Sequence, residues 1–250
     1  MPLDLERIVA VVLAGGYGTR VQHLLPQLPK PMASVAGKPF LEWVVRYLGR
    51  QGIPKILLST GYLGNVIEEH FDSLSIPGAQ IRCCRETEPL GTAGGFLNAA
   101  DSEPKPSAWL VLNGDSLVFA SLAALTELLV DSTVDGAILG VSTRDASRFG
   151  TLVSDEGGNL LRFAEKRSGA GTINAGIYLL RPALLEALPR NVPLSFEQDV
   201  FPRWLEGGKR LKIRAIAAPF LDIGTPESLP QAEAFIQQNY EQLSYRYRKI

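Results

Sequence analysis

The sequence is poor in cysteine and has almost no excess charge, and both scarcities exclude classes of protein. Its 250 residues include two cysteines, Cys83 and Cys84, which are adjacent. Adjacent side chains in a strand point to opposite faces, so we expect neither a disulfide nor a metal site from this pair. The net charge is −1, with 25 basic and 26 acidic residues, so no overall field favours nucleic acid or a membrane surface as a partner.

Long apolar runs are lacking too. No run of about 18 apolar residues occurs, and the first residues do not have the layout of a signal peptide. The sequence therefore predicts a cytoplasmic protein that has no membrane partner. Apolar residues make up 46% of the chain, which is enough to bury the core of one large domain.

Two familiar phosphate-binding motifs are absent as well. Residues 15–20 read Gly-Gly-Tyr-Gly-Thr-Arg, which is neither the G-x-G-x-x-G of dinucleotide-binding proteins nor a loop ending in Gly-Lys-Ser/Thr. The apolar run at 8–13 predicts a buried strand that leads into this loop. Its glycines would let the backbone close around a phosphate chain. A glycine-rich turn without a ligand is the alternative for such a loop taken alone.

Two cations follow the glycines. Arg20 ends the loop, and Lys30 stands between Pro29 and Pro31. Prolines on both sides stiffen the backbone, which favours a positioned charge over a solvated one. Together the loop and its cations predict a site for a nucleoside triphosphate.

Strand-like and helix-like segments alternate through the first half. The pattern predicts strands at 8–13, 55–59, 80–84, 108–112 and 136–142, and helices at 40–48, 62–72, 92–100 and 121–130. Gly49 and Gly52 are expected to end the first of these helices. This alternation predicts an α/β fold, namely a single Rossmann-like mixed, mostly parallel sheet with helices on both faces. Ligands are expected at the carboxyl ends of its strands.

The second half is less regular. We expect a hairpin over 151–163 with its turn at 156–159, a strand at 173–180, a capping box at 195–198 and a final helix from about 226 to 243, capped by Thr225. No linker separates independent domains. We expect one domain over 1–250, with a nucleotide-binding half at about 1–135, a sugar-phosphate-binding half at about 136–225, and a C-terminal helix and tail at 226–250.

Two aspartates end apolar strands. Asp115 follows the run at 109–112, and Asp222 follows Phe220-Leu221. Mg²⁺ at triphosphate sites takes one or two carboxylates together with phosphate oxygens, so both aspartates are candidate Mg²⁺ ligands. The alternatives are a turn aspartate for Asp115 and an acid favoured by a helix dipole for Asp222.

The chain resembles the sugar-1-phosphate nucleotidyltransferases. The loop at 15–20 followed by Pro-Lys-Pro at 29–31 looks like the signature of that family, and Asp-Ile-Gly-Thr-Pro at 222–226 matches its second metal segment. These enzymes join a nucleoside triphosphate and a sugar 1-phosphate to give a nucleotide sugar and pyrophosphate. Five motifs occur in order from residue 8 to about 235, and the resemblance implies the nucleotide-diphospho-sugar transferase fold.

The resemblance implies roles for individual residues. Arg20, Lys30 and Asp115 would be catalytic, and Asp115 and Asp222 would bind Mg²⁺ as the cofactor. The nucleotide would contact a larger set, comprising Leu13, Ala14, Gly15, Gly16, Gly18, Thr19, Glu86, Gly91, Thr92 and Gly114. In this reading Gly91 lets the base edge reach the backbone, and Thr92 starts the helix that follows.

Glu86 is the candidate for nucleobase selection. A carboxylate has two acceptor oxygens, which suit the neighbouring N1–H and N2–H donors of guanine, whereas uracil offers a single N–H. The alternative is that Glu86 and Glu88 are both solvated loop acids.

The sugar side is predicted from two further motifs. In the family, a Glu-Lys pair followed by Asn-x-Gly-x-Tyr contacts the sugar hydroxyls and the sugar phosphate, and Glu165, Lys166, Asn174 and Gly176 match those positions. The chain departs from the family at Arg167, where proline is common. Taken alone, a Glu-Lys pair is most often an exposed ion pair of small energetic value.

Within the family the chain looks most similar to the D-glycero-α-D-manno-heptose 1-phosphate guanylyltransferases. The resemblance implies transfer from GTP to that sugar phosphate for surface polysaccharide synthesis. Two alternatives remain: a uridylyl- or thymidylyltransferase acting on a hexose or amino-sugar 1-phosphate, and a non-catalytic regulatory subunit that binds a nucleotide sugar. The expected partners are the two substrates and no nucleic acid, and the sequence leaves a homo-oligomer open.

Overall fold

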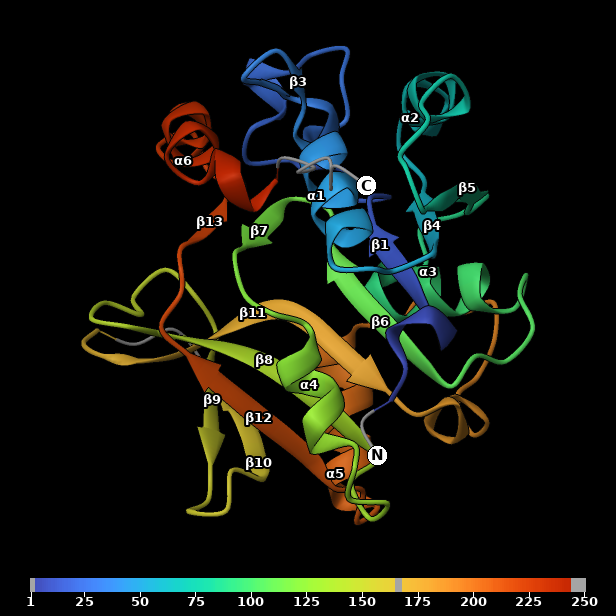
Figure 1. Cartoon of the computed structure of the whole chain (residues 1–250), viewed down its shortest axis with the longest axis vertical. Coiled ribbons are helices and arrows are strands. Elements are labelled where there is room, and N and C mark those ends of the chain that lie inside the picture. Colours follow the sequence, from blue (N-terminus) through green and yellow to red (C-terminus); the bar gives the residue numbers. More distant parts are fainter. Residues whose placement is uncertain (1–2, 165–167, 244–250) are drawn as a thin grey trace, which may run out of the picture.

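A nine-stranded sheet forms the centre of the molecule, a computed structural model that describes residues 3–164 and 168–243. The strand order is β10-β9-β11-β6-β1-β4-β5, with β8 paired to β11 and β12 paired to β8. The strands are β1 (Ile8–Leu13), β4 (Lys55–Thr60), β5 (Gln80–Arg85), β6 (Ala108–Asn113), β8 (Gly136–Thr143), β9 (Thr151–Ser154), β10 (Leu160–Ala164), β11 (Gly171–Leu180) and β12 (Leu211–Ile216). In Figure 1, β1, β4 and β5 lie in the upper right and β8, β9, β10 and β12 in the lower left.

The sheet is mixed and mostly parallel, as the sequence predicts. Strands β5, β4, β1 and β6 run parallel, and β12 is parallel to β8. Strand β11 is antiparallel to both of its long neighbours, β6 and β8. It therefore joins the parallel block to the strands of the second half.

Helices cover both faces of the sheet, because the parallel strands are apolar on both sides. Along β1, Ile8, Ala10 and Val12 belong to one core cluster, and Val9 and Val11 belong to the other. The helices are α1 (Phe40–Arg50), α2 (Gly64–Asp72), α3 (Gly91–Ala100), α4 (Ala123–Leu128), α5 (Phe201–Glu206) and α6 (Ala232–Gln238). Phe40 and Leu41 of α1 belong to the first cluster, whereas Phe96 of α3 and Phe201 of α5 belong to the second. In the described part of the chain, no helix is both long and apolar enough to cross a membrane.

Two small ribbons stand beside the main sheet. Strands β7 (Ser116–Val118) and β13 (Phe220–Asp222) form one antiparallel ribbon, and β2 (Ser34–Val35) and β3 (Lys38–Pro39) form the other. Short 3-10 turns complete the fold at Leu5–Arg7, Gln22–Leu24, Lys30–Met32, Pro182–Leu185, Leu229–Gln231 and Tyr240–Gln242, and a π-helical turn spans Phe196–Val200. The β7–β13 ribbon is the one that bears on the site.

Several predicted boundaries are wrong. The final helix is broken: Thr225 caps a single turn by accepting the N–H of Ser228 at 3.3 Å, a 3-10 turn containing Pro230 follows, and α6 begins only at Ala232. Proline has no N–H to donate to the preceding turn, which explains the break. Gly49 lies inside α1, and Gly52 supplies the left-handed residue after it, with φ +82°. Strand β12 was not predicted.

Candidate active site

A cavity of about 330 Å³ opens at the carboxyl ends of β1, β4 and β6, the edge where the sequence places the ligand. Leu13 ends β1 and Asn113 ends β6, and both line the cavity. Ten of the residues predicted from sequence line it together: Leu13, Ala14, Gly15, Gly16, Gly18, Lys30, Glu86, Gly91, Thr92 and Asp115. The glycine loop, Lys30, the residues predicted to contact the nucleobase and Asp115 are therefore brought to one place.

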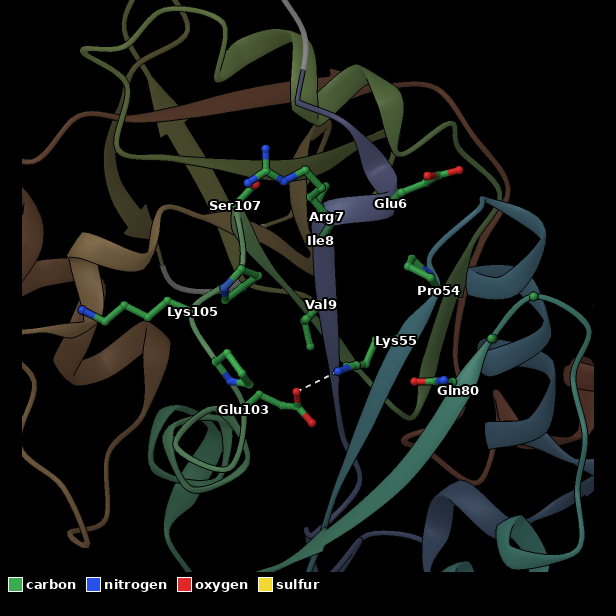
Figure 2. A pocket seen from close by; sticks show the side chains of 14 residues that line it. Glu6, Arg7, Ile8, Val9, Pro54, Lys55, Gln80, Glu103, Lys105 and Ser107 are labelled. Atoms are coloured by element: carbon green, nitrogen blue, oxygen red, sulfur yellow. Dashed lines mark hydrogen bonds and ion pairs between the residues drawn. The ribbon is translucent and has the colours of Figure 1, made fainter.

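A larger hollow of about 700 Å³ lies at the opposite edge, where the parallel strands begin (Figure 2). Its floor includes Val9 and Pro54, and Figure 2 shows Lys55 pointing across it to Glu103, with 2.9 Å between Nζ and Oε2. Lys55, Glu103 and Lys105 of its lining form ion pairs within the protein, and the hollow has no loop like that at residues 15–20. Open α/β sheets bind ligands at the carboxyl edge, so the smaller cavity is the candidate active site.

Lys30 is held at the wall of the smaller cavity. It begins a 3-10 turn after Pro29, which has extended backbone angles, and its side chain is 12% exposed. Its ammonium group forms an ion pair with the carboxylate of Asp115. A β-carbon on Gly18 would lie 2.8 Å from Cβ of Lys30, so the glycine loop packs directly on the lysine stem.

The β7–β13 ribbon places Asp222 next to Asp115. Asp222 pairs with Ser116 across the ribbon, and the N–H of Ile223 donates to the carbonyl oxygen of Asp115 at 2.9 Å. Burial and then the negative charge of Asp115 raise the pKa of Asp222, while the charge of Lys30 opposes the shift. Two carboxylates side by side repel each other unless a cation lies between them.

The donor set at this point fits magnesium. No group of three or more histidine, cysteine, aspartate or glutamate side chains gathers around a metal position within residues 3–164 and 168–243. Magnesium needs fewer: one or two carboxylates, with phosphate oxygens and water completing its shell. Asp115 and Asp222 together could therefore hold Mg²⁺ jointly with a bound triphosphate.

Glu86 turns into the protein between two glycine-containing segments. The N–H of Leu90 donates to its Oε2 at 3.2 Å, and a β-carbon on Gly95 would lie 3.1 Å from the same oxygen. Gly15 likewise leaves room for Oε1. Burial raises the pKa of Glu86 above 4.5, and the hydrogen bond from Leu90 opposes the shift. Glu88, by contrast, is exposed, so the two acids of this loop differ in environment.

Gly91 and Thr92 contact a segment from the second half as well as the cavity. Gly91 has φ +70° and begins α3, so the helix starts one residue before the position predicted for Thr92. A β-carbon on Gly91 would lie 2.6 Å from the carbonyl oxygen of Leu194, and the hydroxyl of Thr92 accepts the N–H of Phe196 at 2.9 Å. Glycine is therefore required here for a close approach of backbone to backbone.

Two of the residues predicted to contact the sugar phosphate, Asn174 and Gly176, lie on β11. Nδ2 of Asn174 donates to the hydroxyl of Tyr178 at 2.7 Å, and its Oδ1 accepts the N–H of Gly176 at 3.0 Å. Gly176, with φ +69°, leaves room for the side chain of Asn113, which lines the cavity. The pairing register of β11 with β8 shifts between Asn174 and Tyr178, and such bulges redirect side chains.

The other predicted residues either do not line the cavity or are outside the described part of the chain. Glu165 and Lys166 are outside the described residues. Thr19 and Arg20 are exposed and do not line the 330 Å³ cavity, although the charge of Arg20 opposes the rise in the pKa of Asp222. Gly114 is buried, does not line the cavity, and donates its N–H to the carbonyl oxygen of Leu13 at 2.9 Å.

The cavity also includes residues that sequence reasoning missed: Tyr17, Pro31, Ser59, Pro89 and Asn113. Ser59 and Asn113 lie at the carboxyl edge of β4 and β6, so the rule that located Asp115 could have found them. Tyr17 is 51% exposed, and its ring lies 5.2 Å from that of Tyr62. An aromatic residue inside a glycine loop was its signal in the sequence.

The fold and this cavity are those of an α/β protein with a candidate nucleotide site at the carboxyl edge of its sheet. The chain belongs to the nucleotidyl transferase family, which matches residues 9–239. This confirms the family resemblance predicted from the glycine loop and the Pro-Lys-Pro segment.

Individual relatives agree with that assignment. The chain is 33% identical over 230 residues to D-glycero-alpha-D-manno-heptose 1-phosphate guanylyltransferase of Aneurinibacillus thermoaerophilus, covering 91% of this chain and 98% of the relative. It is 35% identical over 232 residues to mannose-1-phosphate guanylyltransferase of Mycobacterium tuberculosis, covering 92% of this chain but spanning only 64% of that relative. The crystal structure of HddC from Yersinia pseudotuberculosis complexed with GMP-PN superposes with a TM-score of 0.78 at 33% identity, covering 90% and 97% of the two chains.

Proposed function

We propose that this protein transfers a guanylyl group from GTP to a sugar 1-phosphate, with D-glycero-α-D-manno-heptose 1-phosphate as the favoured acceptor. The products are a nucleotide sugar and pyrophosphate. The observation that carries the proposal is the half-buried carboxylate of Glu86 in the wall of the cavity that the glycine loop and Lys30 also line. Similarity to guanylyltransferases of mannose and manno-heptose 1-phosphate supports the same nucleotide.

Glu86 supports guanine through its acceptor geometry. One oxygen accepts the N–H of Leu90, and the carboxylate keeps further lone pairs for donors from a ligand. Guanine presents two adjacent N–H donors, whereas adenine and the pyrimidines do not present that pair. A half-buried carboxylate that lacks hydrogen-bond donors is unfavourable. Binding of a base without the paired N–H groups therefore costs free energy, whereas guanine supplies the donors.

The phosphates would lie against the glycine loop. Backbone N–H groups of the loop and the ammonium of Lys30 would bind the triphosphate, with Lys30 stabilising charge at the α-phosphate. Arg20, which is exposed at the end of the same loop, would add a second cation. Asp115 and Asp222 would hold Mg²⁺, which neutralises phosphate charge when bound.

The chemistry is an in-line displacement. An oxygen of the sugar 1-phosphate attacks the α-phosphorus, the bond from that phosphorus to the bridging oxygen breaks, and pyrophosphate leaves with the electron pair. We propose that Asn174 and Gly176 orient the sugar, with Glu165 and Lys166 from outside the described residues. Positioning and charge neutralisation supply most of the rate in such reactions. Both substrates also favour a cytoplasmic location.

The test is pyrophosphate release with Mg²⁺ across GTP, ATP, UTP and dTTP, each with mannose, manno-heptose, glucose and amino-sugar 1-phosphates. Release confined to GTP with manno-heptose 1-phosphate is the expected result. Pyrophosphate release with UTP or dTTP would still support nucleotidyl transfer to a sugar 1-phosphate, but it would contradict guanine selection by Glu86. Nucleotide binding without release for any sugar would favour the non-catalytic subunit instead.

A further inference from the structure

Leu194–Glu197 bridges the two halves of the candidate site. On one side, the carbonyl oxygen of Leu194 accepts the N–H of Ala93 at 2.9 Å, and the N–H of Phe196 donates to Thr92 at 2.9 Å. The segment is thus fixed to the start of α3. On its other side, Glu197 reaches across to Tyr178 of β11.

A chain of hydrogen bonds runs from Glu197 to Asn174. The hydroxyl of Tyr178 donates to Oε1 of Glu197 at 2.8 Å and accepts from Nδ2 of Asn174 at 2.7 Å. The other carboxylate oxygen of Glu197 accepts from the hydroxyl of Ser195 at 3.2 Å. Tyr178 is 0% exposed, so its hydroxyl cannot touch a ligand and serves only its two protein partners.

The chemistry of Glu197 fixes the direction of this chain. An ionised carboxylate can only accept, so the single proton of the Tyr178 hydroxyl is committed to it. Burial, followed by the charge of Glu197, raises the pKa of Tyr178 well above its ordinary value, which keeps that proton in place. The hydroxyl can then only accept from Asn174, so the amide must turn its Nδ2 toward Tyr178.

The opposite end of the amide is fixed as well, because its Oδ1 accepts the N–H of Gly176 at 3.0 Å. A flipped amide would place Oδ1 against the hydroxyl oxygen and Nδ2 against a backbone N–H, which loses both bonds. Asn174 therefore keeps one N–H and one lone pair free in a defined orientation. Matching such a pair to sugar hydroxyls is how a site reads stereochemistry.

We propose that Glu197 is a positioning residue for the sugar 1-phosphate, acting through Tyr178 to orient the amide of Asn174. The inference rests on the proposed function, because it takes Asn174 as a sugar contact. Glu197 touches neither substrate in this account. Its effect is to hold the amide of Asn174 in one orientation, with Nδ2 toward Tyr178 and Oδ1 toward Gly176.

The experiment measures KM and kcat for GTP and for the sugar 1-phosphate found active with the unmodified protein. Glu197→Ala and Tyr178→Phe should each raise KM for the sugar 1-phosphate about tenfold, the cost of one misdirected hydrogen bond, with kcat and KM for GTP nearly unchanged. Glu197→Gln keeps an acceptor oxygen and should restore most of the sugar affinity. Because Glu197 acts through Asn174, combining Glu197→Ala with Asn174→Ala should add nothing to Asn174→Ala alone.

Tyr47→Phe is the matched control. Tyr47 is 1% exposed and donates its hydroxyl to the carbonyl of Ala120, so the change removes a buried tyrosine hydroxyl away from the cavity. It should lower stability and leave both KM values unchanged. An unaltered sugar KM in Glu197→Ala, or additive effects with Asn174→Ala, would overturn the proposal and leave the enzyme activity standing. Absence of pyrophosphate release from the unmodified protein with every sugar would overturn the proposed function, and this inference with it.

Discussion

The Oε1 oxygen of Glu86 lies 2.5 Å from the point where Gly61 would carry a β-carbon. A methyl group cannot occupy that position without moving the carboxylate, and it would also come within 2.8 Å of the carbonyl oxygen of Gly15. Gly61 directly follows β4, and Glu86 directly follows β5. The end of β4 therefore limits the position of the carboxylate at the end of β5.

Gly61→Ala should therefore weaken GTP binding by about tenfold or more, because Glu86 and Gly15, the two displaced groups, line the candidate active site. KM for the sugar 1-phosphate should change much less. Steady-state kinetics with each substrate varied in turn measure the difference, and the thermal midpoint checks that the variant folds. Unchanged KM for GTP in a folded variant would show that the position of the Glu86 carboxylate does not matter for the nucleotide.

The protonation state of Glu86 gives a second prediction. Burial raises its pKa above 4.5, so the carboxyl gains a proton at a higher pH than an ordinary glutamate does. A protonated carboxyl no longer accepts from both guanine N–H groups, so KM for GTP should rise as pH falls through that raised pKa. In Glu86→Gln, KM for GTP should be high and lack this rise.

Inosine triphosphate provides the matching probe, because its base lacks the 2-amino group. The unmodified protein should prefer GTP to inosine triphosphate by about tenfold, and Glu86→Gln should lose most of that preference. Equal use of both nucleotides by the unmodified protein would contradict paired recognition by the carboxylate.

Local patterns in the sequence predict the parallel block and the cavity well, because each depends on a few adjacent residues. The apolar run at 8–13 predicts β1, and the glycines after it predict the loop that lines the cavity. Strand ends predict Asp115 and Asp222 as candidate ligands. The pairing of β7 with β13, about 100 residues later, brings the two aspartates together and cannot be predicted from local patterns.

Long-range contacts explain what could not be predicted. Nothing in the sequence indicates that Gly91 lies against Leu194. The chain of hydrogen bonds from Glu197 through Tyr178 to Asn174 likewise joins residues that share no sequence motif. Strand β12 pairs in parallel with β8, which precedes it by about 70 residues, so no turn between the two strands marks the pairing in the sequence. The break in the final helix, by contrast, is predictable from sequence, because Pro230 lies inside the expected helix and has no N–H to donate to the preceding turn.

Lys30→Ala should lower kcat by about 10²-fold or more, as loss of a single electrostatic group often does. The ammonium is held beside Asp115 and its side chain is 12% exposed, whereas Arg20 is exposed and does not line the cavity. Lys105→Ala is the control, because Lys105 is 71% exposed at the opposite edge of the sheet. Near-normal turnover of Lys30→Ala would remove this residue from the mechanism.

Asp222→Asn should raise the Mg²⁺ concentration needed for half-maximal pyrophosphate release by about tenfold or more. The amide removes one negative charge from the pair formed with Asp115, and the attraction of that pair for a divalent cation falls accordingly. Asp72→Asn, an exposed change at the end of α2, is the control. The same Mg²⁺ requirement in Asp222→Asn and in the control would exclude Asp222 as a ligand.

Glu42 gives a prediction for stability that is independent of the site. Its side chain is 4% exposed and contacts Arg46 at 2.7 Å, His70 at 2.9 Å and Lys38 at 3.5 Å. Burial raises the pKa of Glu42, but the hydrogen bonds from Arg46 and His70 and the charges of Arg46 and Lys38 lower it by more, so its net pKa lies below 4.5. A lowered folded-state pKa means that ionised Glu42 stabilises the fold above the unfolded pKa and loses that effect as pH falls through the folded value.

Glu42→Gln should therefore lower the free energy of unfolding by about 1–3 kcal/mol at neutral pH, because Arg46 and Lys38 lose their charged acceptor and the hydrogen bond to His70 loses its carboxylate. As pH falls from about 4.5 through the lower folded-state pKa, Glu42 takes up a proton, first in the unfolded and then in the folded protein, and the difference between the two proteins should shrink. Urea denaturation at pH 7 and at pH 4 measures both differences. Pyrophosphate release at pH 7 should be unaffected, since Glu42 lies on α1 and does not line the candidate active site. A stability difference that stays constant between the two pH values would mean that packing of the side chain, and not its charge, stabilises α1.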